Sequence, residues 1–128
     1  ALPIYVLKEI KPEKRGAGVN AAQGILAEEK RIVAEIPEQS YLVVLDERGK
    51  APTSVELAAY LKQWQQNGEH VCFVIGGADG MTEALKQKAR MMMRLSSLTL
   101  PHGMVRVLLT EQLYRAVSIL HNHPYHRE

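Results

Sequence analysis

A glycine-rich segment at residues 76–80 has the first pattern in the sequence that is suited to ligand binding. It reads Gly-Gly-Ala-Asp-Gly and follows the apolar run at residues 71–75. Glycine lets a ligand approach the backbone closely. The spacing matches neither the dinucleotide pattern G-x-G-x-x-G nor the P-loop, so a phosphate cradle is not supported. Two interpretations stay open: a tight turn with no ligand, and a loop that holds a neutral nucleoside through backbone groups.

Residues 95–103 read Leu-Ser-Ser-Leu-Thr-Leu-Pro-His-Gly and carry three hydroxyl groups and a histidine just before a long helical pattern. One interpretation is an edge strand with a polar face, in which His102 is a surface histidine with no special role. The other is that Pro101 to Gly103, which follow a strand predicted at residues 95–100, lie where ligands bind at the end of a parallel sheet.

The C-terminal segment at residues 120–128 gathers three histidines, a tyrosine and an arginine. The spacing of His121, His123 and His126 suits no common metal-ligand pair, so we expect no metal site. The consecutive letters His-Asn-His do not indicate a nuclease, whose motif residues are spread through a larger element. Tyrosine and histidine can stack on a base while arginine pairs with phosphate, which indicates a nucleic-acid contact. The alternative is a disordered terminus.

Basic side chains elsewhere offer further candidate contacts. Arg106 and Arg115 are nine positions apart, which is about two and a half turns of a helix, so they face opposite sides. One is expected to face RNA while the other pairs with a protein carboxylate, and Glu111 is placed to pair with Arg115. Lys14 and Arg15 belong to a basic loop that either contacts phosphate or is a solvated charge run.

Composition excludes several classes of protein. Sixteen basic and fourteen acidic residues leave a net charge of +2, too balanced for a histone-like protein. Hydrophobic residues make up 46% and charged residues 23%, which argues against disorder. No apolar run approaches the roughly 18 residues of a membrane span, and no secretory signal is present. The lone Cys72 excludes an internal disulfide and is expected to be a core residue. These features predict a cytoplasmic protein.

Strand and helix patterns alternate along the chain, as expected for an α/β fold with a largely parallel sheet. Ligands bind such sheets beyond the carboxyl ends of the strands. The predicted strands are residues 2–10, 41–45, 71–75 and 95–100, and the predicted helices are residues 19–36, 53–66, 82–93 and 104–121. The connecting segments are a mobile basic loop at 11–18, a polar turn at 46–52 and a break at 101–103.

Three separated motifs, at residues 74–80, 95–102 and 122–128, together resemble the ribosomal RNA large subunit methyltransferase H family. The resemblance covers nearly the whole chain from Tyr41 onward. It implies a SPOUT-class parallel-sheet α/β sandwich with a C-terminal trefoil knot, and a homodimer. The implied activity is methyl transfer from S-adenosyl-L-methionine to N3 of pseudouridine 1915, in helix 69 of 23S rRNA within the assembled 70S ribosome.

The resemblance also implies roles for particular residues. N3 of pseudouridine becomes a good nucleophile only as its proton leaves, so a base or a cation that stabilises the anion would help. His126 is the hypothetical base, Arg115 or Arg127 the stabiliser, and Tyr125 a further catalytic candidate. The implied cofactor residues are Leu45, Asp46, Gly76, Gly77, Ser96, Ser97, Leu98, Thr99, Leu100 and Pro101. The candidate RNA contacts are His102, Arg106, Arg127, Lys14 and Arg15.

The chain departs from the family at its start. Family members usually have a strand and a helix before the strand predicted at residues 2–10, and these elements are missing here, so residues 1–128 are interpreted as one domain without them. The alternative function is a non-catalytic RNA-binding or ribosome-associated module on the same fold. The intact glycine loop and the segment 96–101 favour the enzyme.

Overall fold

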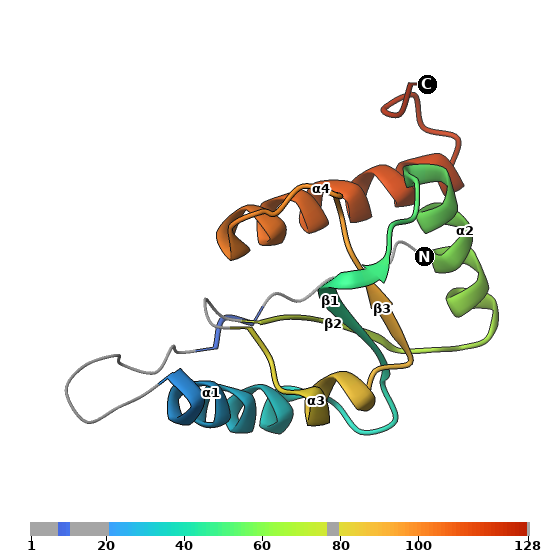
Figure 1. Ribbon diagram of the computed structural model, residues 1–128. Coiled ribbons are helices and arrows are strands. Elements are labelled where there is room, and N and C mark those ends of the chain that lie inside the picture. Colours follow the sequence, from blue (N-terminus) through green and yellow to red (C-terminus); the bar gives the residue numbers. More distant parts are fainter. Residues whose placement is uncertain (1–7, 11–20, 77–79, 128) are drawn as a thin grey trace.

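The computed structural model describes residues 8–10, 21–76 and 80–127. It is an α/β structure in which helices cover both faces of a small sheet (Figure 1). In chain order the elements are α1 (Ala21–Glu35), β1 (Tyr41–Lys50), α2 (Ser54–Gln66), β2 (Val71–Ile75), α3 (Glu83–Gln87), β3 (Met91–Met93) and α4 (His102–Leu120).

The sheet is parallel, with the strand order β2-β1-β3, and this confirms the predicted class of fold. The connection from β1 to β2 passes through α2, and the connection from β2 to β3 passes back across β1 through α3. Because the two connections run in opposite directions and use opposite faces, they have the same hand, as parallel crossovers require. The strand β1 is therefore central and is covered on both faces.

Alternating side chains of β1 build two cores, because successive residues of a strand point to opposite faces. Val43 and Leu45 pack with residues of α2 and α4, including Leu57 and Leu113. Val44, on the other face, belongs to a second core. The other members of that core include Leu42, Val74 and Leu85, with Ile32 and Ile36 packed against it. This explains why residues 41–45 are a continuous apolar run.

The helix α2 matches its prediction closely. Thr53 is the N-cap. Its hydroxyl accepts from the backbone N–H of Glu56 at 3.0 Å, and the carboxylate of Glu56 accepts from the backbone N–H of Thr53 at 2.9 Å. This reciprocal pair is the predicted capping box. The helix ends before Gly68, whose φ of +67° is readily adopted only by glycine.

The strand β1 is longer than predicted, and the polar turn expected at residues 46–52 is wrong in its first part. After Leu45 the strand bulges, so that Met93 is opposite both Leu45 and Lys50. The backbone N–H of Arg94 donates to the carbonyl of Lys50 at 2.8 Å. Gly49 permits this pairing, because a Cβ there would lie 2.4 Å from the backbone nitrogen of Met93.

Two predictions around β3 are wrong. The helix expected at residues 82–93 has its predicted cap at Thr82 but ends at Gln87, and the three methionines form β3 instead of the end of that helix. Pairing with β1 overrides the helix preference of methionine, since the N–H of Arg90 already donates to the carbonyl of Leu42 at 2.8 Å. Residues 95–100 are not a strand; they form the irregular connection to α4.

The predicted start of the last helix and the predicted first strand also need correction. Pro101 is the N-cap of α4, and His102 and Gly103 lie in the helix instead of breaking the chain. Residues 8–10 are not in a strand, and the rest of the predicted strand and loop, residues 1–7 and 11–18, lie outside the described residues. Among the described residues, no helix has the length and apolar character needed to cross a membrane.

Candidate cofactor and catalytic site

The last residues of β2 and β3 lie beside the position at which β1 bulges. Leu45 of β1 is the register partner of Ile75 in β2 and of Met93 in β3. The residues that follow these positions therefore leave the sheet at one edge. The structure thus brings two of the three predicted cofactor segments, Leu45 with Asp46 and the segment starting at Gly76, next to the start of the third.

Gly76 is in close contact with the side chain of Met81 and the backbone of Gly80. A Cβ at this position would lie 2.7 Å from Cγ of Met81 and 3.3 Å from the carbonyl carbon of Gly80. Gly80 itself has a φ of +86°, which glycine adopts without strain. A side chain is therefore disfavoured at both ends of the predicted glycine loop, by crowding at Gly76 and by backbone conformation at Gly80. Gly77, the other glycine predicted to bind cofactor, lies outside the described residues.

The carboxylate of Asp46 is engaged in contacts within the protein. Its side chain is 7% exposed, Oδ2 lies 2.8 Å from Nζ of Lys86, and Oδ1 accepts from the backbone N–H of Arg48 at 2.8 Å. Burial raises the pKa of Asp46, but the hydrogen bonds from Lys86 and from the backbone of Arg48 outweigh it and hold the pKa below 3.8. The backbone of Asp46, rather than its carboxylate, is therefore the group suited to a ligand.

The third predicted segment, residues 96–101, is largely open to solvent. The hydroxyl of Ser96 accepts from the backbone N–H of Leu98 at 2.9 Å, which forms a local turn. The side chain of Leu98 is 76% exposed. The segment thus presents hydroxyl groups, backbone groups and an apolar side chain at the edge where the strands end.

Arg94 was missed by sequence reasoning. It follows β3 directly, at the same sheet edge as Asp46 and Gly76. Within the described part of the chain, its Nε is buried and has no hydrogen-bond partner. A buried N–H without an acceptor is costly, so a ligand oxygen would relieve that cost. A basic residue just before a hydroxyl-rich segment is the only signal that the sequence offered.

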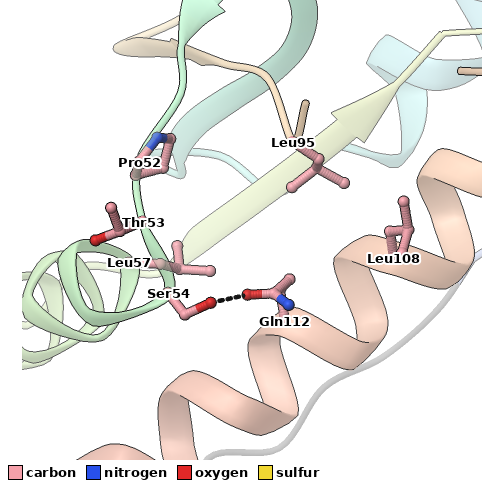
Figure 2. Close-up of a pocket in the computed structure, with 7 residues that line it drawn as sticks. All are labelled: Pro52, Thr53, Ser54, Leu57, Leu95, Leu108 and Gln112. Atoms are coloured by element: carbon pink, nitrogen blue, oxygen red, sulfur yellow. Dashed lines mark hydrogen bonds between the residues drawn. The ribbon is translucent and has the colours of Figure 1, made fainter. Parts of the chain in front are cut away.

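A pocket of about 240 Å³ opens between α2 and α4 (Figure 2). Its lining includes Leu95, the residue just before the predicted segment, and a hydrogen bond of 2.5 Å from the hydroxyl of Ser54 to Oε1 of Gln112 crosses it. None of the predicted cofactor residues that the structure describes lines this pocket. Its volume is also below the roughly 300–1,000 Å³ of ordinary ligand sites, so it accommodates at most part of a cofactor.

The three predicted catalytic residues contact one another. Arg115 of α4 places its guanidinium carbon 4.7 Å from the ring centroid of Tyr125 and its Nη1 3.2 Å from Nδ1 of His126. The Tyr125 ring packs edge-on against Tyr114, with centroids 4.8 Å apart. The predicted pair also forms, since Nε of Arg115 donates to Oε1 of Glu111 at 2.9 Å. The C-terminal segment is therefore docked on α4.

The contact with Arg115 also decides which nitrogen of His126 carries the proton. A guanidinium can only donate hydrogen bonds, so Nδ1 of His126 must accept, and the proton of the neutral ring is on Nε2. In this arrangement the N–H of His126 is on Nε2, which is buried, while the lone pair on Nδ1 is already used by Arg115.

The predicted RNA-contacting residues are dispersed. Arg106 forms an ion pair with Glu9, so both arginines of α4 pair with carboxylates, on opposite sides of the helix. His102 and Arg127 are exposed. Lys14 and Arg15 lie outside the described residues. Among the residues that the structure describes, no cluster of three histidine, cysteine or acidic side chains could hold a metal ion.

Cys72 lies in β2, packed against the second core, as predicted. Burial raises the pKa of its thiol above 9.0. The thiol is therefore disfavoured as a thiolate nucleophile, in agreement with a packing role.

Comparison with known proteins defines the class first. A family model described as "Predicted SPOUT methyltransferase" matches residues 3–126. The chain is also 87% identical over 124 residues to "Ribosomal RNA large subunit methyltransferase H" of Neisseria meningitidis serogroup C / serotype 2a, covering 97% of this chain and 80% of that protein. The protein of the same name from Chromobacterium violaceum is 64% identical over 122 residues, covering 95% and 78% of the two chains. The chain belongs to the ribosomal RNA large subunit methyltransferase H family of SPOUT methyltransferases.

Proposed function

We propose that this chain transfers a methyl group from S-adenosyl-L-methionine to N3 of pseudouridine 1915, in helix 69 of 23S rRNA within the 70S ribosome. The family supplies the reaction class, and relatives 86–87% identical carry the name of an rRNA methyltransferase. The observation that carries the proposal is the shared register of Leu45, Ile75 and Met93, because it gathers the predicted cofactor segments at one edge.

The residues at this edge fit the cofactor. The glycines at positions 76 and 80 bring backbone groups close together, which suits a nucleoside that is held without phosphate-binding charges. Segment 96–101 adds hydroxyl and backbone groups. The buried Nε of Arg94 suits the carboxylate of the methionine moiety. Leu45 and the backbone of Asp46 complete the proposed cofactor site.

When bound, S-adenosyl-L-methionine supplies a methyl group attached to a sulfonium. The reaction forms the bond from N3 to this methyl carbon, breaks the carbon–sulfur bond and releases the N3 proton. Negative charge develops on the uracil-like ring as the proton leaves. We propose that Arg115 and His126 stabilise this charge by donating hydrogen bonds, with Tyr125 holding the guanidinium in place.

The arrangement of His126 narrows its proposed role. A general base needs a free lone pair at the proton that it removes. The lone pair on Nδ1 is occupied by Arg115, so His126 acts as a base only after that contact breaks. We therefore assign His126 the role of hydrogen-bond donor through Nε2, with proton release to solvent or to a group of the ribosome.

A homodimer is the proposed assembly. Met104, Val107 and Tyr114 lie on one stripe of α4, since their spacings of three and seven residues bring them to the same side of a helix. All three side chains are exposed, Val107 by 60%, and Leu98 precedes the same helix. An exposed apolar stripe of this kind is suited to a second copy of the chain. The implied trefoil knot at the C-terminal part of the sheet is also part of the proposal, with family membership as its support.

RNA contact is proposed at exposed cations around α4 and the C-terminal segment. His102 and Arg127 are exposed, and Arg106 is half-exposed although it is paired with Glu9. Lys14 and Arg15 are proposed on sequence grounds alone. The small net charge of +2 supports weak binding to free RNA and recognition of the assembled particle instead.

The test is methyl transfer to 70S ribosomes that lack the modification at position 1915. Radiolabelled cofactor reports transfer, and mass spectrometry of the rRNA locates the methyl group. Isolated 23S rRNA serves as the comparison substrate. Label at N3 of pseudouridine 1915 on 70S ribosomes supports the proposal. Ribosome binding without cofactor binding or transfer would replace it with the non-catalytic module.

A further inference from the structure

A buried glutamate of α1 is bound to Thr82, two residues after the glycine loop at residues 76–80. Glu29 is 9% exposed, and its carboxylate reaches from α1 to Thr82. Oε2 accepts from the Thr82 hydroxyl at 2.7 Å, and Oε1 accepts from the Thr82 backbone N–H. A carboxylate offers two acceptor oxygens, and both are used on this one residue.

This contact fixes the orientation of the Thr82 hydroxyl. The hydroxyl has a single proton, which it donates to Glu29, so its lone pairs are left to accept other bonds. One of them accepts from the backbone N–H of Leu85 at 3.3 Å, which caps α3. Glu29 therefore sets the direction of the cap as well as the position of the Thr82 backbone.

Thr82 is one residue from the contact that closes the glycine loop. Met81 and Gly80 pack against Gly76 so closely that a Cβ on Gly76 would clash with Met81. A displacement of Thr82 moves Met81 and Gly80 with it, because they are successive residues of the chain. The position of Gly76 relative to Gly80 is thus coupled to Glu29, through a contact between Glu29 and Thr82, which are 53 residues apart in sequence.

The same short helix is tied to the end of β1. Nζ of Lys86 in α3 lies 2.8 Å from Oδ2 of Asp46, and Nη2 of Arg48 lies 2.7 Å from Oε1 of Glu83. The helix α3 is therefore held by α1 on one side and by the end of β1 on the other. We infer that Glu29 is a positioning residue: through Thr82 it holds the two ends of the glycine loop in the geometry that binds S-adenosyl-L-methionine. This inference rests on the proposed function.

The experiment compares Glu29→Gln with the unsubstituted chain. Glutamine keeps the size of the side chain but has only one acceptor oxygen, so it cannot take both bonds from Thr82. Calorimetric titration should show roughly tenfold weaker binding of S-adenosyl-L-methionine, as expected for loss of a hydrogen bond to a charged group. The rate at saturating cofactor should change less than the affinity. Amide hydrogen exchange without cofactor should become faster at Gly76, Gly80 and Thr82.

Matched variants separate positioning from general damage. Glu35→Gln removes another carboxylate of α1, one that pairs with Lys8 on the surface, and should leave affinity and exchange unchanged. Thr82→Val should reproduce the loss, Thr82→Ser should restore binding, and the double variant Glu29→Gln/Thr82→Val should be no weaker than the weaker single variant. Thr82→Val also provides the test if Glu29→Gln fails to fold.

The outcomes are distinct. Unchanged affinity in Glu29→Gln, or weakened affinity with unchanged exchange at Gly76 and Gly80, would overturn the inference. Additive losses in the double variant would overturn it too, since they would mean that the two residues act separately. If the unsubstituted chain does not bind S-adenosyl-L-methionine, the proposed function fails together with the cofactor role of Glu29. Exchange at Gly76 and Gly80 then decides alone whether Glu29 positions the loop ends.

Discussion

Nη1 of Arg115 lies 3.2 Å from Nδ1 of His126, and this contact joins the middle of α4 to the C-terminal segment. The same guanidinium lies over the ring of Tyr125 and pairs with Glu111. Because the arginine is a permanent donor, it holds the histidine in the tautomer with the proton on Nε2. The two residues thus form one unit whose function depends on both.

This unit predicts a difference between two substitutions of His126. Glutamine keeps an N–H near the place of Nε2 and alanine does not, so His126→Ala should lower the single-turnover rate on 70S ribosomes by about 100-fold. His126→Gln should retain about a tenth of the rate. Equal losses in both variants, together with a changed pH profile of the rate in His126→Gln, would identify His126 as a base instead.

Asp46 predicts a pH dependence of stability. Its pKa in the folded chain is below the ordinary 3.8, so its contribution is present above pH 4 and is lost as the pH falls through the folded pKa. Asp46→Asn should lower the free energy of unfolding by about 1–2 kcal/mol at pH 7, and this difference should shrink as the pH falls below 3.8 and through the folded pKa. Urea unfolding at a series of pH values from 7 downward measures this. A deficit that does not shrink at the acid end of the series would contradict it, and the exposed Glu38→Gln is the control.

Gly49 predicts a severe substitution, because its backbone lies directly against that of β3. Its missing Cβ would lie 2.4 Å from N of Met93 and 2.5 Å from C of Met92, and both are backbone atoms. Gly49→Ala should therefore force β1 and β3 apart and lower the free energy of unfolding by about 3 kcal/mol. Gly103→Ala is the matched control, because nothing lies within 4 Å of its added Cβ and alanine favours a helix. Chemical unfolding should show a loss of stability in Gly49→Ala and a gain of about 0.5–1 kcal/mol in the free energy of unfolding of Gly103→Ala. Similar values for both would contradict the close strand contact.

The sequence predicted the elements whose signals are local. The apolar runs of β1 and β2 and the capping box of α2 depend on neighbouring residues, and the structure confirms them. The strand β3 was missed because three methionines favour a helix on their own. Only their pairing with β1, more than forty residues earlier, makes them a strand. A periodicity argument does not include that pairing.

The site shows the same division. Residue types indicated that the C-terminal segment and Arg115 matter, but their mutual contact depends on how the chain turns after α4. The contact from Glu29 to Thr82 had no sequence signal, because a glutamate on a helix is normally interpreted as a solvent-exposed charge. Asp46 is implied for cofactor binding, and the engagement of its carboxylate by Lys86 of α3 had no sequence signal.

The apolar stripe of α4 predicts that one charge will separate the proposed dimer. Val107→Glu places a carboxylate in the middle of the stripe formed by Met104, Val107 and Tyr114. Light scattering on purified protein should show a dimer for the unsubstituted chain and a monomer for the variant, because burying an unpaired charge is costly. Ala59→Glu, which adds the same charge on an exposed position of α2, should remain dimeric. A dimer that survives Val107→Glu would assign the interface to another face.

Arg94 predicts opposite effects on stability and on cofactor binding. Its buried Nε has no acceptor within the described structure, so the free protein carries the cost of an unsatisfied donor. Arg94→Met keeps a long side chain without polar hydrogens, and should raise the free energy of unfolding of the cofactor-free protein by about 1 kcal/mol. It should also weaken binding of S-adenosyl-L-methionine about tenfold, because the carboxylate of the methionine moiety loses its partner. Urea unfolding and calorimetric titration measure the two effects on the same preparation. Gain of stability with unchanged affinity would show that the guanidinium does not contact the cofactor, whereas loss of both would show that it supports the end of β3.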